Sequence, residues 1–152
     1  MTTRRLRAGR EEEAGALTEL ALRSKGHWGY DEEFLAACRE ELTMREGELA
    51  ARRTTVAEEA GRVLGFSTLE GTAPQGWVGM LFVDPPAIGH GVGRLLYRNV
   101  LEAAGRLGFT RLTIDADPYA EPFYLAMGAR RIGAAPSGSI PGRMLPLLEA
   151  LP

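Results

Sequence analysis

The chain has 152 residues, a length typical of one domain with a single core. Its 45% hydrophobic and 25% charged residues are ordinary for a globular protein, and no apolar run approaches the ~20 residues of a membrane-spanning helix. The net charge of −2 argues against a nucleic-acid-binding surface, which is usually basic. No apolar stretch of a secretory signal follows the N-terminus, and the lone Cys38 cannot form an internal disulfide. We therefore expect a cytoplasmic protein with one domain over residues 1–152 and without a membrane or nucleic-acid partner.

The first half of the chain alternates between helical and extended patterns. Residues 11–25 have apolar positions on one helical face and acidic residues in the first turn, and Gly26 follows as a stop. Asp31 is a suitable N-cap for the next helix. In chain order, the expected elements are a strand at 3–7, helices at 11–25 and 32–42, and a hairpin of strands 52–57 and 62–69.

The second half contains the strongest helical pattern. The largely apolar run 77–83 is typical of a central strand, and the helix expected at 91–107 follows it with apolar residues at the 3.6-residue period. A strand at 111–115 would complete a parallel crossover. A helix at 119–127 and a strand at 129–135 are expected next, and the apolar segment 144–148 forms either a last strand or a dimer contact.

Three glycines at alternate positions, Gly89, Gly91 and Gly93, lie between the central strand and the long helix. Glycine lets the backbone approach a ligand closely, and the first turn of a helix offers unpaired N–H groups to an anion. The loop lacks the Lys-Ser or Lys-Thr of a P-loop. It also lacks the third glycine of a dinucleotide-binding loop, since Arg94 or Leu96 stands there.

The segment Ile88-Gly89-His90-Gly91-Val92-Gly93 resembles the acyl-CoA loop of the GCN5-related N-acetyltransferases (GNAT), whose pattern is Arg/Gln-x-x-Gly-x-Gly/Ala. It departs from the pattern at Ile88, where Arg or Gln is usual. Further on, the segment 120–128 is similar to the family's Ala-x-x-Phe-Tyr-x-x-x-Gly, with Asp117 where Asn is frequent three residues earlier. The resemblance covers the order of elements from residue 3 to about residue 135.

The resemblance implies an α/β fold of the α+β kind. Its sheet would be mixed and mostly antiparallel, with about six or seven strands, a parallel crossover at a splayed centre, and about four helices. The implied reaction is the direct transfer of an acetyl group from acetyl-CoA to a small-molecule or peptide amine. Two alternatives stay open, namely transfer of a different acyl group and a non-catalytic acyl-CoA-binding regulatory domain. Dimerisation is common among relatives, so a homodimer is also considered.

The family's donor site maps onto three segments of this chain. The N–H groups of 89–94 would bind the diphosphate, the strand 81–83 would hold the pantetheine arm, and Tyr124 would protonate the leaving thiolate. Arg94 would face either a phosphate or solvent. The donor-binding residues that the resemblance implies are Leu81, Phe82, Val83, Ile88, Gly89, His90, Gly91, Val92, Gly93, Arg94, Asp117, Ala120 and Tyr124.

The acceptor side is less defined by the sequence. His27, Trp28 and Tyr30 lie in the loop that borders the acceptor in this family, where the two larger rings would form either a substrate wall or a hydrophobic plug. Glu70 and Glu33 are candidates for the base, but each could equally be a surface acid. Cys38 is expected in the core, and no residues have metal-ligand spacing, so no metal is expected.

Overall fold

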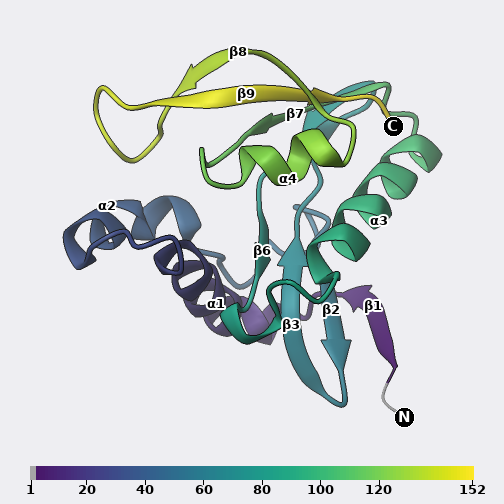
Figure 1. Ribbon diagram of the computed structural model, residues 1–152. Coiled ribbons are helices and arrows are strands. Elements are labelled where there is room, and N and C mark those ends of the chain that lie inside the picture. The colour runs from purple at the N-terminus through teal and green to yellow at the C-terminus, as the bar shows by residue number, and fades with distance from the viewer. Residues whose placement is uncertain (1–2) are drawn as a thin grey trace.

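The computed structural model describes residues 3–152, whose nine strands form two separate sheets (Figure 1). The N-terminal sheet is antiparallel, with the order β1-β2-β3-β6. The C-terminal sheet has the order β4-β5-β7-β9-β8, in which β5 and β7 run parallel and the other pairs are antiparallel. The strand bounds are β1 Arg4–Ala8, β2 Thr55–Glu59, β3 Arg62–Ser67, β4 Glu70–Thr72, β5 Gln75–Trp77, β6 Leu81–Val83, β7 Arg111–Asp115, β8 Arg130–Pro136 and β9 Met144–Ala150.

The central apolar run is split between the two sheets, which corrects the prediction of one strand at 77–83. β5 pairs with β7, whereas β6 leaves that sheet and pairs with β3. The crossing point is Gly79, where a Cβ would lie 1.7 Å from Oε2 of Glu70, so any other residue there would have to displace that carboxylate. β6 and β7 therefore diverge, and the splayed centre that the resemblance implied is confirmed.

Four α-helices of the described chain pack around these sheets. They are α1 (Ala14–Gly26), α2 (Glu32–Leu42), α3 (Val92–Arg106) and α4 (Glu121–Ala126). Short 3₁₀ turns, η1 (Glu11–Glu13) and η2 (Pro85–Ala87), precede α1 and the glycine loop. Figure 1 shows α1 and α2 on one side of β6 and α3 on the other, while α4 lies under the C-terminal sheet. α3 is the crossover that brings the chain back to β7 parallel to β5.

Each sheet has its own apolar core. Leu17 and Phe66 are buried between α1 and the N-terminal sheet, and Tyr97, Leu112 and Leu148 are buried between α3 and the C-terminal sheet. The segment 144–148 belongs to the last strand, β9, in which Leu148 is buried. Within residues 3–152, no helix combines the length and the apolar character needed to cross a bilayer.

The structure differs from the sequence-based expectation mainly in the short strands. The predicted loop at 71–75 contains the hairpin of β4 and β5, which raises the described strand count to nine. Within this hairpin Gly71 of β4, which pairs with Gly76 of β5, has a φ of +99°, a conformation that favours glycine. β2 begins at Thr55 rather than at residue 52. Strands of three residues carry too few alternating positions to produce a pattern.

Candidate functional site

A cleft of about 530 Å³ runs between the diverging strands β6 and β7. One end is formed by the glycine loop and the start of α3, and the other by α1, α2 and the loop that joins β8 to β9. The cleft therefore passes between the two sheets. Its wall includes Lys25, Trp28, Cys38, Glu41, Leu81, Phe82, Val83, Ile88, Gly89, Gly91, Val92, Gly93, Arg94, Asp115, Asp117, Tyr119, Ala120, Phe123, Tyr124, Ser139 and Arg143.

The glycine loop has the geometry of an anion site. Gly89 and Gly91 have φ values of +85° and +84°, which favour glycine over any residue with a Cβ. The N–H of Leu95 donates to the carbonyl of Gly91 at 3.1 Å, which closes the first full turn of α3. The three N–H groups of residues 92–94 come before that hydrogen bond in the chain. Those N–H groups and the helix dipole face the cleft and attract negative charge.

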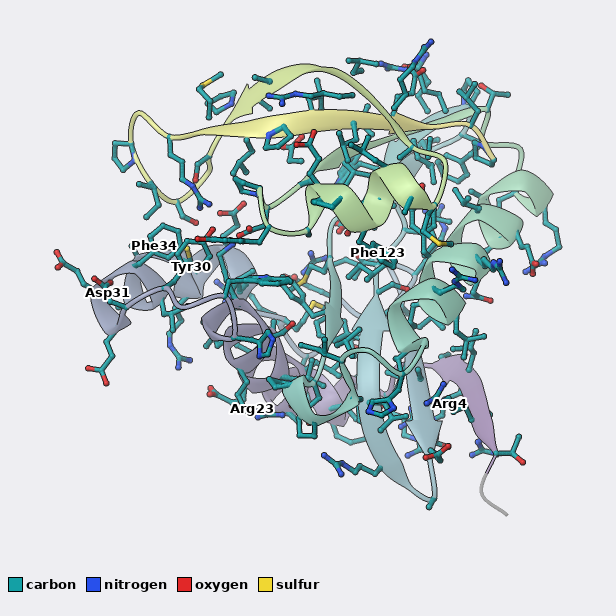
Figure 2. All side chains as sticks on the ribbon, viewed as in Figure 1. Arg4, Arg23, Tyr30, Asp31, Phe34 and Phe123 are labelled. Carbon is teal, nitrogen blue, oxygen red and sulfur yellow. The ribbon has the colours of Figure 1, made fainter. Side chains whose placement is uncertain are left out.

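Two contacts hold the loop at its ends. At the helix end, an ideal Cβ on Gly93 would lie 3.4 Å from the ring of Phe123, so α3 and α4 pack closely there (Figure 2). At the strand end, the buried Asp84 accepts a hydrogen bond from Nε of Arg23 on α1 at 3.1 Å, and Arg62 lies 3.8 Å from the same carboxylate. The loop is thus anchored to α1 and α4.

The strand β6 turns alternate main-chain groups into the cleft. Phe82 pairs with Phe66 of β3, and the flanking residues Met80 and Asp84 also bond to the β3 side. Because backbone groups alternate direction along a strand, the N–H and C=O groups of Leu81 and Val83 face the open edge toward β7. That edge can bind an extended ligand through the main chain.

Tyr124 lies on the cleft wall near the middle of the cleft. Its side chain is 6% exposed, and its ring packs edge-on against Tyr97 and Phe123 at centroid distances of 5.6 and 5.2 Å. Burial is the main cause that raises the pKa of Tyr124 above its ordinary value, with smaller contributions from Tyr97 and Asp117. The phenol therefore keeps its proton at neutral pH and can donate it.

The aromatic residues of the loop after α1, residues 27–30, lie partly on the cleft wall and partly in contacts outside it. Trp28 lines the cleft and stacks on Tyr119, with ring centroids 5.5 Å apart and an interplanar angle of 10°. His27 is exposed and packs edge-on against Trp28, outside the cleft wall. The side chain of Tyr30 also lies off the wall, stacked on Phe34 at 4.1 Å (Figure 2). His90, within the glycine loop, is not on the cleft wall, and its carbonyl oxygen accepts a hydrogen bond from Arg4.

Asp117 lines the cleft and links several segments at the end formed by α1, α2 and the β8–β9 loop. Its carboxylate accepts hydrogen bonds from Nζ of Lys25 at 3.0 Å and from the hydroxyl of Tyr30 at 3.0 Å. Arg143 donates to the Tyr30 hydroxyl at 2.6 Å, and its guanidinium lies over the ring of Phe34. Burial is the main cause that raises the pKa of Tyr30 to about 12, and the neighbouring Asp117 carboxylate is the second cause. These contacts tie α1, α2 and the β8–β9 loop to the end of β7.

Neither predicted base candidate reaches the cleft. Glu70 accepts hydrogen bonds from Nε and Nη2 of Arg52, each at 3.1 Å, and from Oγ1 of Thr68 at 2.8 Å. Its carboxylate occupies the space beside Gly79 and stabilises the crossing between the sheets. Glu33 lines a separate open hollow on the other side of α2.

Two other carboxylates do line the cleft, and sequence reasoning missed them as candidates for a base. Asp115 ends β7, and burial of its carboxyl, with a smaller contribution from Glu41, raises its pKa above the ordinary value. Glu41 is on α2 and accepts a hydrogen bond from the hydroxyl of Ser139. Within residues 3–152, neither carboxylate has a basic group within 4.0 Å. The position of Asp115 at the end of a central strand was the signal that could have indicated it.

Cys38 is buried in the α2 core and borders the cleft. In the part of the chain that the structure describes, no three His, Cys, Asp or Glu side chains are grouped to hold a metal ion.

The profile of the acetyltransferase (GNAT) domain family matches residues 10–137. The chain belongs to this family. Among solved structures, the GNAT chain resembles the PaiA N-acetyltransferase of Thermoplasma acidophilum in complex with coenzyme A, with a TM-score of 0.81, 18% identity, and coverage of 98% of this chain and 99% of that one. A GCN5-related N-acetyltransferase of Rhodopseudomonas palustris has a TM-score of 0.80 and 25% identity, with 98% of this chain and 96% of that chain covered.

A third similar structure is that of yncA from Salmonella typhimurium with acetyl-CoA. It has a TM-score of 0.69 and 19% identity, with 98% of this chain and 94% of that chain covered. A comparison with curated proteins finds no match. The solved structures thus confirm the GNAT fold, and two of them hold coenzyme A or acetyl-CoA in their own sites.

Proposed function

We propose that this GNAT domain transfers an acetyl group from acetyl-CoA to a primary amine. The observation that carries the proposal is one continuous cleft that joins a helix N-terminus to a buried tyrosine and to two carboxylates with no basic group within 4.0 Å among the described residues. Acetyl-CoA, when bound, supplies the activated thioester. Structures of PaiA and yncA with coenzyme A and acetyl-CoA support this donor.

The donor half of the cleft fits the chemistry of such a molecule. The N–H groups of residues 92–94 match the oxygens of a diphosphate, which needs donors and positive charge rather than a specific side chain. The open edge of β6 supplies main-chain partners at Leu81 and Val83 for the amide groups of a pantetheine arm. Arg94 lines the cleft in the first turn of α3, where a bound phosphate would attract its positive charge.

The reacting groups meet between Tyr124 and the end of β7. The amine nitrogen forms the amide bond as the C–S bond breaks, and the sulfur takes a proton from Tyr124. The nitrogen arrives as an ammonium ion and first gives one proton to Asp115, directly or through water. Its second proton, lost as the amide bond forms, replaces the one that Tyr124 has given to the sulfur. A main-chain N–H on the open edge of β6 would stabilise the negative charge on the thioester oxygen.

The acceptor half carries more negative than positive side chains, since Asp115, Glu41 and Asp117 line it together with Lys25 and Arg143. Asp115 and Glu41 bring two negative charges to the wall without a basic partner within 4.0 Å among the described residues. At neutral pH a primary amine arrives as an ammonium ion, so these carboxylates would attract it and then receive its proton. This charge pattern supports an amine over an alcohol or an acid as acceptor.

The first experiment measures donor binding and thiol release. We expect calorimetry to detect binding of acetyl-CoA and coenzyme A but not of NAD, and free thiol to appear with a panel of small primary amines and short peptides. Binding without thiol release for any amine would favour the non-catalytic alternative. A faster reaction with a longer acyl-CoA would identify that molecule, rather than acetyl-CoA, as the donor. Absence of all coenzyme A binding would refute the proposal.

The second experiment tests the acceptor half. Asp115→Asn and Glu41→Gln should raise the KM for the amine, because each removes one negative charge from the wall. Glu33→Gln is the matched control, since this glutamate lies on α2 outside the cleft. Equal kinetic constants for all three variants would contradict the assignment of the acceptor end.

A further inference from the structure

The glycine loop lacks a long polar side chain at the position where its family usually has one. Ile88 stands where Arg or Gln is usual, and its apolar side chain lines the cleft. A guanidinium reaches the loop from a different place. Nη1 of Arg4, on β1 and 86 residues earlier in the chain, donates a hydrogen bond to the carbonyl oxygen of His90 (Figure 2).

This hydrogen bond controls the direction of the next N–H. In a trans peptide, the carbonyl of one residue and the N–H of the following residue point in opposite directions. With the His90 carbonyl held toward Arg4 and β1, the N–H of Gly91 points away from β1. Gly91 lines the cleft, whereas Arg4 is not among the described residues on its wall. The contact behind the loop thus turns a donor toward the anion site in front of it.

The loop needs such a restraint because it is built from glycine. Gly89 and Gly91 both adopt positive φ, and glycine visits positive and negative φ almost equally when nothing restrains it. Nη1 of Arg4 would lie 3.6 Å from a Cβ on Gly91, so the guanidinium is in contact with this part of the loop. An arginine at this point therefore selects one of several loop conformations before a ligand arrives.

Fold stability alone does not explain the placement of Arg4. Its Nε is buried and, within the described residues, has no hydrogen-bond partner, the nearest carboxylate oxygen being that of Glu59 at 3.8 Å. A buried donor without a partner is destabilising. The side chain nevertheless keeps this position, in which Nη1 of Arg4 reaches the glycine loop.

We propose that Arg4 is a positioning residue for the diphosphate of the donor and takes over the task that an Arg or Gln at position 88 performs elsewhere in the family. The inference rests on the proposed function, since it assumes that acetyl-CoA binds along this cleft. Arg4 acts through the His90–Gly91 peptide, and its positive charge behind that peptide also strengthens the attraction of the N–H for an anion.

The test compares Arg4→Ala, Arg4→Lys and Arg5→Ala in the full chain. Arg5 is the matched control, because it is the next residue of β1 and its exposed side chain pairs with Glu58 at 2.6 Å. Calorimetry should show the Kd for coenzyme A raised about tenfold by Arg4→Ala, equal to about 1.4 kcal/mol. Arg4→Lys should recover most of the affinity, and Arg5→Ala should leave it within about twofold.

A second measurement separates positioning from a general effect on the fold. Acetylpantetheine lacks the diphosphate, so Arg4→Ala should lower kcat/KM for acetyl-CoA but leave kcat/KM for acetylpantetheine unchanged. An equal loss with both donors, or equal weakening by Arg4→Ala and Arg5→Ala, would overturn the inference. If Arg4→Ala does not fold, Arg4→Gln gives the same comparison. Absence of coenzyme A binding by the unaltered protein would instead refute the proposed function.

Discussion

Gly89→Ala tests whether the left-handed conformation of the loop is needed for donor binding. Gly89 has a φ of +85°, and an ideal Cβ placed on it has no atom within 4 Å, so the new methyl group meets no neighbour. The cost therefore comes from the backbone alone, at about 1–2 kcal/mol for a residue with a Cβ in this region. Since the residue is exposed, we expect the loop to relax to another conformation.

Restoring the bound conformation would then cost the same free energy, which corresponds to a Kd for coenzyme A raised about 5- to 30-fold. If the loop stays strained instead, the free energy of unfolding falls by that amount and the Kd does not change. Calorimetry with coenzyme A and urea unfolding measure the two quantities on the same variant.

Gly105→Ala is the control, because Gly105 is an exposed helical residue of α3 with open space around it and should gain up to about 1 kcal/mol of stability. A Gly89→Ala protein with unchanged affinity and unchanged stability would refute the reasoning.

Three further predictions follow from single contacts. Tyr124→Phe should lower kcat by about 10²- to 10⁴-fold with an unchanged Kd for coenzyme A, and unchanged turnover would exclude the phenol as the acid. A hydrogen bond from Arg7 lowers the pKa of Glu13 below its ordinary value, so this pair stabilises the fold above about pH 4.3 and loses its effect as the pH falls through the lowered pKa. Urea unfolding at several pH values should therefore show a smaller loss of stability in acid for Glu13→Gln, and parallel curves would contradict this. Leu148→Ala, at a fully buried site of β9, should cost about 2–5 kcal/mol, and a loss below 1 kcal/mol would contradict the core assignment.

Local patterns predicted most of the helices and the glycine loop that forms one end of the cleft. The helix at 32–42 was predicted with the bounds that the structure shows, because Asp31 caps it and accepts a hydrogen bond from the N–H of Phe34 at 2.8 Å. The long helix after the glycine loop was predicted within one residue at each end, since its apolar face repeats over four turns. These features depend on residues only a few positions apart.

The acceptor end was predicted much less completely. Trp28 was named and lines the cleft, but Tyr30 turns to Asp117 and Arg143, and the carboxylates of Asp115 and Glu41 were missed. These side chains come from α1, α2, β7 and the β8–β9 loop, and nothing in the local sequence of one segment indicates which of the others it will face. The roles of all these residues in binding and catalysis remain proposals for the experiments above.

The sequence by itself determined that a glycine-rich loop leads into an amphipathic helix, because glycine spacing and helical periodicity are local properties. The tertiary structure alone decided where the central apolar run divides, since the Glu70 carboxylate occupies the space beside Gly79 and the chain changes sheets there. It also decided that Arg4 reaches the carbonyl of His90 from 86 residues away. Contacts at such separation depend on how two sheets diverge and pack, and the pattern of neither segment contains that information.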